Sequence, residues 1–409
     1  MSDSIQEITP KQSSVISIMR GIAIFFVVML HAKDFFLANI YAYNGTNDNL
    51  TFQFELLNVG ASRVGIFFFI SGFLLYKLRN RESNTKQYFT KRIARLAPLW
   101  ITFFTLSTIA ATLAITWWFP ANHYLFTNFY GNGFNLNDPT LILPALAYLF
   151  FFGWLMPSYF NTAIPGGWSI QMEAINYALF PILNRINFTT IFLTATAIQT
   201  SYTIYYLIDY PQNKETYLTQ VNQGQTPSIE ILYLITTSIY WFITGMYLAH
   251  YTNTNQLNTR PKLTPETLAF GTLALATITT TWLSHPAWYP STQIQTTILI
   301  ILVALTATWI TTNTHKLKTI LTNLGKYSYG IYFVHFIILA PTTYYASLIA
   351  QPYLNTNLPL VWLTYTTMLL TSITACYYIS KLLYKTIEKP WIVKAHKQNK
   401  PADKTIHDR

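Results

Sequence analysis

The chain has 409 residues, of which 51% are hydrophobic and only 10% are charged. An ordinary soluble domain carries about 25% charged residues, so this composition excludes a soluble body and favours a multi-pass membrane protein. The net charge of +11 would by itself suggest a nucleic-acid partner. We exclude that partner because the basic residues lie in short loops between apolar segments.

Ten segments are long and apolar enough to cross about 30 Å of hydrocarbon at about 1.5 Å per residue. In chain order they cover residues 15–36, 64–79, 97–119, 168–185, 187–207, 229–250, 266–284, 292–312, 327–349 and 358–384. A further apolar stretch, 141–155, is short and flanked by Pro and Gly, so we expect a re-entrant or interfacial piece. The predicted fold class is all-α, a polytopic membrane bundle of about ten transmembrane helices.

Lysine and arginine set the expected orientation of these spans. With the N-terminus in the cytoplasm, the loop 77–95 and its seven basic residues lie inside, whereas the outer side keeps only Lys33, Arg63 and Lys214. We therefore place both termini in the cytoplasm. Residues 1–14 form a cytoplasmic segment, 15–392 form one membrane domain, and the polar tail 393–409 is expected to be disordered.

His31, Glu173 and His335 are ionisable side chains inside predicted spans, where each costs at least ~2.5 kcal/mol and is by default a functional hypothesis. His31 lies eleven residues after Arg20, roughly 16 Å along a helix, at or beyond the midplane. Glu173 is the only acidic residue well inside a span, and His335 lies midway through another. Each also has a structural alternative, namely a buried polar group that bonds to a neighbouring helix.

The largest inner loop contains the sequence RIAR, which places Arg92 and Arg95 three residues apart. On a helix these residues share a face, and two guanidinium groups there can clamp a phosphate. The alternative is that the two arginines anchor the cytoplasmic end of the helix by contacting lipid headgroups. The spacing alone favours this alternative over a phosphate clamp. Tyr329, Tyr332 and His335 are likewise spaced three residues apart, near one helix face, although such an aromatic stripe usually serves packing.

Six stretches, in this order, resemble the membrane acyltransferase-3 family of bacterial O-acyltransferases that modify surface glycans. They are MRGIAIFFVVMLHA (19–32), SRVGIFFFISGFLLYK (62–77), YFTKRIARLAPLW (88–100), WSIQMEAINYALFPIL (168–183), LGKYSYGIYFVHFIIL (324–339) and YKTIEKPWI (384–392). The resemblance implies ten helices in the bacterial inner membrane with both termini cytoplasmic. It also implies cytoplasmic acyl-CoA, most often acetyl-CoA, as co-substrate and a hydroxyl of a lipid-linked or surface glycan as acceptor.

The resemblance also implies roles for particular residues. His31 matches the catalytic histidine and Arg20 its companion, while Arg92 and Arg95 match paired arginines linked to CoA binding. The expected lining of the site comprises Asp34, Arg63, Ser71, Trp168, Tyr332 and His335. Many members carry Asp where this chain has Gly65, so acceptor preference does not carry over from the Asp-bearing branch.

The expected chemistry is general-base catalysis by His31, whose imidazole takes the proton of the sugar hydroxyl as that hydroxyl attacks the thioester. Glu173 is the candidate carboxylate beside the imidazole, with Asp34 second. An acyl-His31 intermediate is an open alternative. We expect acyl-CoA, a glycan and the bilayer as partners, with no metal and no permanently bound cofactor. The alternative function is a glycan or small-molecule transporter.

Overall fold

The computed structural model describes residues 8–44, 62–79, 84–112, 134–160, 163–222, 228–253 and 291–397. Within these ranges the chain consists of helices and connecting turns, without strands, as the predicted all-α class requires. The predicted span 266–284 lies outside the described residues.

The long helices follow the order of the predicted spans. They are α1 (Pro10–Asn44), α3 (Ser62–Lys77), α4 (Thr85–Thr112), α7 (Gly167–Leu183), α8 (Phe188–Asn222), α9 (Ser228–Asn253), α11 (Ser291–Asn313), α12 (His315–Ala350) and α13 (Leu358–Leu383). Short elements are η2 (Pro139–Leu141), α6 (Ile142–Leu149), η3 (Gly153–Leu155), η4 (Pro157–Tyr159), η6 (Gln351–Tyr353), the π-helix η7 (Tyr384–Glu388) and α14 (Lys389–Lys397).

Several of these helices can cross a bilayer. Among the described residues, five stretches are long and apolar enough: Pro10–Ile40, Glu230–Thr252, Thr296–Asn313, His315–Tyr353 and Leu358–Lys397. The apolar stretches Val64–Lys77 and Pro139–Leu149 are shorter. The chain is therefore a multi-pass membrane protein, while the number of ten spans and their orientation stay predictions.

Two helices begin well before the predicted spans. Both α4 and α12 begin twelve residues before the segments 97–119 and 327–349. Hydropathy marks only the part of a helix that suits hydrocarbon, and helical hydrogen bonding continues beyond it into polar sequence. For the same reason our expectation of a disordered tail from residue 393 is wrong for residues 393–397, which belong to α14.

The apolar stretch 141–155 does not form one long helix. It divides into the end of η2, α6 and η3, and α6 has only 8 residues. At about 1.5 Å per residue, α6 is about 12 Å long, far less than a bilayer core of about 30 Å. This length is what a re-entrant or interfacial piece requires.

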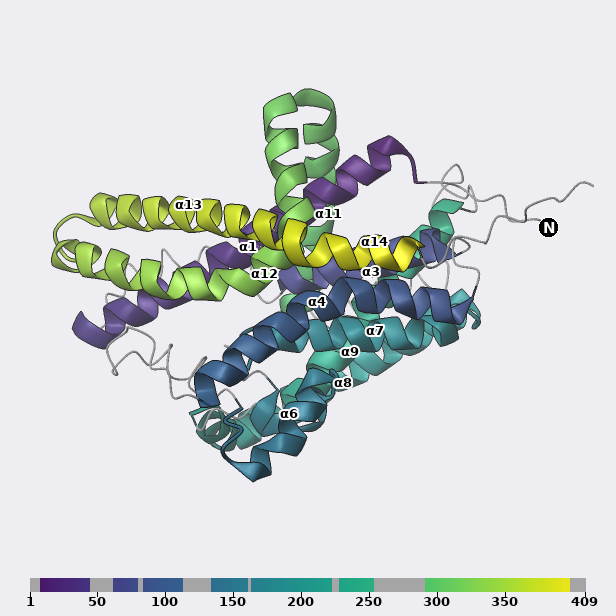
Figure 1. Cartoon of the computed structure of the whole chain (residues 1–409), viewed down its shortest axis with the longest axis horizontal. Coiled ribbons are helices and arrows are strands. Elements are labelled where there is room, and N and C mark those ends of the chain that lie inside the picture. The colour runs from purple at the N-terminus through teal and green to yellow at the C-terminus, as the bar shows by residue number, and fades with distance from the viewer. Residues whose placement is uncertain are drawn as a thin grey trace, which may run out of the picture.

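Glycines allow the central helices to approach closely. α1 runs along α12, and α12 lies beside α13 (Figure 1). A Cβ on Gly325 of α12 would collide with the backbone carbonyl of Ser17 on α1, and a Cβ on Gly21 would collide with that of Leu321. Small residues at such crossings bring helix backbones together in membranes. This packing fixes α1 against the middle of α12, where both contribute to the site.

Candidate active site

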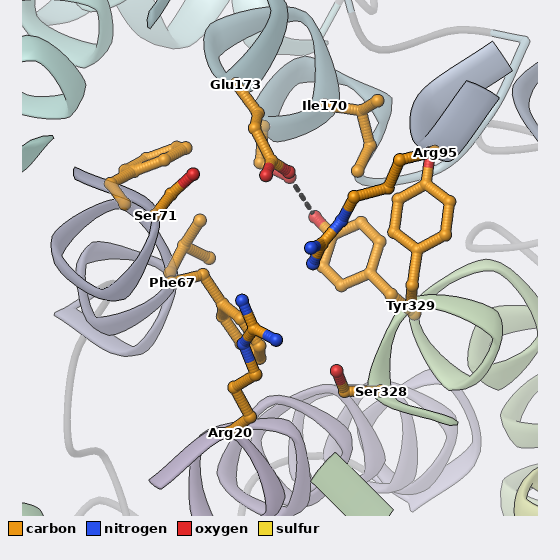
Figure 2. Close-up of a pocket in the computed structure, with 12 residues that line it drawn as sticks. Arg20, Phe67, Ser71, Arg95, Ile170, Glu173, Ser328 and Tyr329 are labelled. Carbon is orange, nitrogen blue, oxygen red and sulfur yellow. Dashed lines mark hydrogen bonds between the residues drawn. The ribbon is translucent and has the colours of Figure 1, made fainter. Parts of the chain in front are cut away.

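A polar pocket lies where α1, α3, α4, α7 and α12 meet (Figure 2). Its empty volume is about 520 Å³, with open space at its mouth included. Its lining consists of Arg20, Val64, Phe67, Phe68, Ser71, Arg95, Ser169, Ile170, Glu173, Ser328, Tyr329 and Tyr332. The pocket thus combines three charged side chains with five hydroxyl groups inside an otherwise apolar bundle.

Three charged side chains converge on this pocket from three different helices. Arg20 on α1, Arg95 on α4 and Glu173 on α7 extend toward one another in Figure 2. Arg20 interacts electrostatically with both Arg95 and Glu173, and Arg95 also interacts with Glu173. Two guanidinium groups and one carboxylate leave the lining one charge positive, which suits an anionic ligand.

Glu173 is held in place by a chain of hydroxyl groups. The Tyr177 hydroxyl, one helical turn later on α7, donates a short hydrogen bond to the Glu173 carboxylate. Ser71 Oγ on α3 lies 3.4 Å from the Tyr177 hydroxyl, and the Tyr88 hydroxyl donates to the Tyr177 carbonyl at 2.9 Å. These contacts join α3, α4 and α7 around one carboxylate.

Arg92 and Arg95 do not form the expected fork inside the pocket. Arg95 lines it, whereas the Arg92 guanidinium lies 5.5 Å from the centre of the Tyr88 ring and 5.8 Å from that of Tyr177. Both guanidinium groups interact electrostatically with Tyr177. The two residues share a face of α4, but one turn of separation along the helix leaves Arg92 beside aromatic rings outside the lining.

The two histidines of the predicted site lie against each other. The ring centroids of His31 and His335 are 5.4 Å apart, and Phe336 lies 4.6 Å from His31. His335 is fully buried, and its Nδ1 donates to the Ile331 carbonyl at 3.2 Å. Because Nδ1 carries the proton, Nε2 is the ring nitrogen with the free lone pair. His335 Nε2 has no hydrogen-bond partner among the described residues.

Tyr332 connects the histidines with the pocket. Its ring lies 5.5 Å from the His335 ring, while its side chain forms part of the pocket lining. The hydroxyl donates to the Gly166 carbonyl at 2.8 Å and lies 2.6 Å from Ser169 Oγ. Gly166 has a φ of 74°, a conformation that side chains rarely adopt, and a Cβ there would lie 2.9 Å from the Tyr332 hydroxyl oxygen.

The described contacts place the two kinds of predicted catalytic residue in different surroundings. Glu173 accepts a hydrogen bond from Tyr177, and His31 packs against His335. That Glu173 also lies beside His31 stays a prediction. Neither histidine is part of the pocket lining, and the His335 ring lies 5.5 Å from that of Tyr332. On α7, Glu173 interacts electrostatically with Arg20 and Arg95.

Two further residues of the expected lining lie elsewhere, and the side chain of a third is not described. Asp34 has a side chain that is 46% exposed and forms an ion pair of 3.1 Å with Lys33. Trp168 is partly buried and packs against an apolar core cluster, not against the pocket. Arg63 lies in the first turn of α3, but its side chain is outside the described part of the structure.

Sequence reasoning missed some residues in and around the pocket. Ser169 in its lining and Tyr177 beside it lie four residues on either side of Glu173, a spacing that places all three on one helix face and could have identified them. Ser328 also lines the pocket and lies within the motif LGKYSYGIYFVHFIIL. Glu388 in η7 is 6% exposed and interacts electrostatically with Arg95, and no feature of the sequence distinguished it from the tail lysines.

The fold and site together define a class: a multi-pass helical membrane protein with a buried cationic pocket beside a histidine pair. The family model described as an acyltransferase domain, acyltransferase-3, matches residues 14–381 of the chain. The chain belongs to this family and is a membrane acyltransferase. No curated protein and no solved structure matches it significantly.

Proposed function

We propose that the protein is an O-acyltransferase of the bacterial inner membrane. It moves an acyl group, expected to be acetyl, from cytoplasmic acyl-CoA to a hydroxyl of a lipid-linked or surface glycan. The observation that carries this proposal is the continuity from Arg95 through Tyr332 to the His335–His31 pair. In this proposal, Tyr332 lies between the arginines that bind the anionic donor and the histidine pair that accepts a proton.

The arginines supply the means to hold the donor. Acyl-CoA carries several phosphates, and guanidinium groups bind phosphate through paired, charge-assisted hydrogen bonds. Arg20 and Arg95 face the pocket, and Arg92 lies one turn before Arg95 on α4. Glu173 limits the net positive charge of the empty pocket, which lowers the cost of keeping two guanidinium groups inside a bundle.

His31 is the proposed general base. An imidazole removes the proton from the acceptor hydroxyl, the oxygen forms a bond to the thioester carbonyl carbon, and the C–S bond breaks to release the CoA thiolate. The thiolate then takes the proton from the imidazolium, so the histidine returns to its starting state. The His335 ring packs against His31, and the hydrogen bond from His335 Nδ1 to Ile331 fixes the orientation of the His335 ring.

An acyl-His31 intermediate would use the same contacts in two steps. In that case the imidazole attacks the thioester and the glycan hydroxyl then attacks the acyl-imidazole. Mixing enzyme with labelled acetyl-CoA in the absence of glycan separates the routes. Label retained on the protein and absent from His31→Ala supports the two-step route, whereas no retained label supports direct transfer.

The test of the proposed function is transfer by purified protein in detergent, with labelled acetyl-CoA and a glycan acceptor. His31→Ala is expected to reduce turnover at least about 10²-fold, the usual contribution of a general base. His315→Ala, at an exposed position at the start of α12, is the matched control and should keep full activity. Full turnover in His31→Ala would remove His31 from the mechanism.

Binding of CoA separates the enzyme from the transporter alternative. Calorimetry should detect CoA binding to the wild-type protein and weaker binding to variants of Arg95. Glycan movement across vesicles without any CoA binding would instead support a transporter.

A further inference from the structure

Among its ionisable side chains, the segment Lys385–Lys397 exposes only basic ones. Its exposed ionisable side chains are Lys385, Lys389, Lys394, His396 and Lys397. The segment contains one acidic residue, Glu388, and this side chain is only 6% exposed. The exposed surface formed by η7 and α14 is therefore uniformly positive, and we refer to these residues, together with Trp391 and Val393, as the α14 surface.

One face of this segment is already occupied. α14 and η7 pack against α4, with Glu388 and Ala395 buried and Ile392 partly buried between them. The spacing of four and three residues is that of one helix face. The remaining faces carry Trp391, which is 49% exposed, and Val393, which is 40% exposed. Exposed apolar and basic side chains thus alternate on the same short helix.

The position of the α14 surface relative to hydrocarbon follows from α13. Exposed positions along α13 carry no charged side chain: they are large apolar residues such as Leu370, Tyr378 and Leu382, each more than half exposed, with threonines between them. The next exposed ionisable residue is Lys385, about 4.5 Å further along the helix. Within one helical turn the exposed side chains change from apolar to basic, which is the pattern of a helix that leaves hydrocarbon and enters the headgroup layer.

We propose that the α14 surface binds the headgroups of anionic phospholipids. Lysine clusters directly beyond a membrane helix are attracted to acidic lipids, at about 1 kcal/mol for each residue near the surface. Tryptophan prefers the boundary between hydrocarbon and headgroups, where Trp391 then lies. Amphipathic helices that combine basic and apolar residues bind at this boundary. This inference holds whichever acyl group the enzyme transfers.

The exposed apolar residues beside the lysines of the α14 surface favour lipid over a soluble partner. A nucleotide or an acidic peptide would satisfy the lysines but would leave Trp391 and Val393 in water. Phospholipid satisfies both, because the acyl chains adjoin the phosphates. The buried face of α14 packs on α4, the helix that carries Arg92 and Arg95, so lipid bound to the α14 surface would stabilise that helix near the candidate active site.

The test uses the full chain in nanodiscs that contain equal amounts of phosphatidylcholine and phosphatidylglycerol. Bromine on the acyl chains of only one lipid quenches tryptophans that touch that lipid. The difference between wild type and Trp391→Phe isolates the Trp391 signal. We expect quenching by brominated phosphatidylglycerol to indicate about fivefold enrichment over phosphatidylcholine, the factor that corresponds to about 1 kcal/mol.

Two comparisons make the result decisive. Replacing Lys385, Lys389 and Lys394 with Gln should remove the preference and leave the protein folded, because all three side chains are exposed. Trp362, partly exposed near the opposite end of α13, lies nineteen residues before Lys381, the next lysine in the sequence, and should show no preference. Equal quenching of Trp391 by both lipids, or a preference that survives the lysine changes, would overturn the proposal.

Discussion

Arg92 and Arg95 lie three residues apart on α4 but differ in their surroundings. Arg95 faces the pocket with Arg20 and Glu173, whereas Arg92 lies over the rings of Tyr88 and Tyr177. A planar guanidinium binds phosphate at two points, and an ammonium cannot reproduce that geometry. A cation over an aromatic ring depends less on the shape of the charged group.

We therefore expect the two lysine substitutions to have different effects. Arg95→Lys should lower kcat/KM for acyl-CoA by about tenfold or more, since each lost charge-assisted hydrogen bond is worth about 1.5–3 kcal/mol. Arg92→Lys should lower it by less than about threefold, because ammonium can still occupy the aromatic site. Initial rates at varied acyl-CoA concentration measure both. Equal losses would contradict the separation of the two arginines.

Tyr177 supports Glu173 through one hydroxyl group. Tyr177→Phe removes the hydrogen bond but keeps the ring over which Arg92 lies, so we expect kcat to fall about tenfold while the protein stays folded. Tyr378→Phe is the matched control, because its side chain is 62% exposed on α13. Unchanged kcat in Tyr177→Phe, measured at saturating acyl-CoA, would show that Glu173 does not need this support.

Sequence reasoning found the charged residues of the pocket but not their partners. Arg20, Arg95 and Glu173 stand out because ionisable groups are costly in apolar helices. Which groups meet depends on how each helix rotates about its axis and which neighbour it packs against, and hydropathy along one segment does not encode either. This is why the hydrogen bond from Tyr177 to Glu173 was not predicted. Tyr177 itself was missed because tyrosine is common in this chain.

At the scale of elements, the contact between α1 and α12 depends on glycine. A Cβ at position 325 would collide with the Ser17 carbonyl, which belongs to the rigid backbone of α1. Gly325→Ala should therefore force the two helices apart and destabilise the protein by about 1–3 kcal/mol, the usual cost of overpacking. Thermal unfolding in detergent, followed by loss of monodisperse protein, should occur several degrees below that of wild type. An unchanged midpoint would show that the helices adjust without cost.

Helix positions were predictable from the sequence, but helix lengths were not. Apolar windows located the helices from α1 to α13, because their side chains must suit hydrocarbon. They did not reveal that α4 and α12 extend twelve residues further, nor that the polar residues 393–397 are helical. Outside hydrocarbon, packing between elements decides the structure. Ala395 is buried there, and α14 packs on α4.

At the scale of the whole molecule, the packing of α12 against α13 determines which parts of the chain lie on the same side of the membrane. The two helices pack along each other and are joined by the short connection 351–357, so they run in opposite directions. Lys316, at the start of α12, and Lys397, at the end of α14, must lie on one side of the membrane. Asn355, between the helices, must lie on the other side. The distribution of lysine and arginine predicts that the side with Lys316 and Lys397 is the cytoplasm.

Single cysteines test this topology in a background in which the buried Cys376 is replaced by Ala. Intact cells treated with a membrane-impermeant maleimide should label Asn355→Cys and Asp138→Cys, both at exposed positions. Lys316→Cys and Lys397→Cys should react only after lysis. The reverse pattern would invert the predicted orientation. Labelling of Asn355→Cys and Lys397→Cys from the same side would show that α13 does not cross the membrane, and the depth assigned to the α14 surface would then be wrong as well.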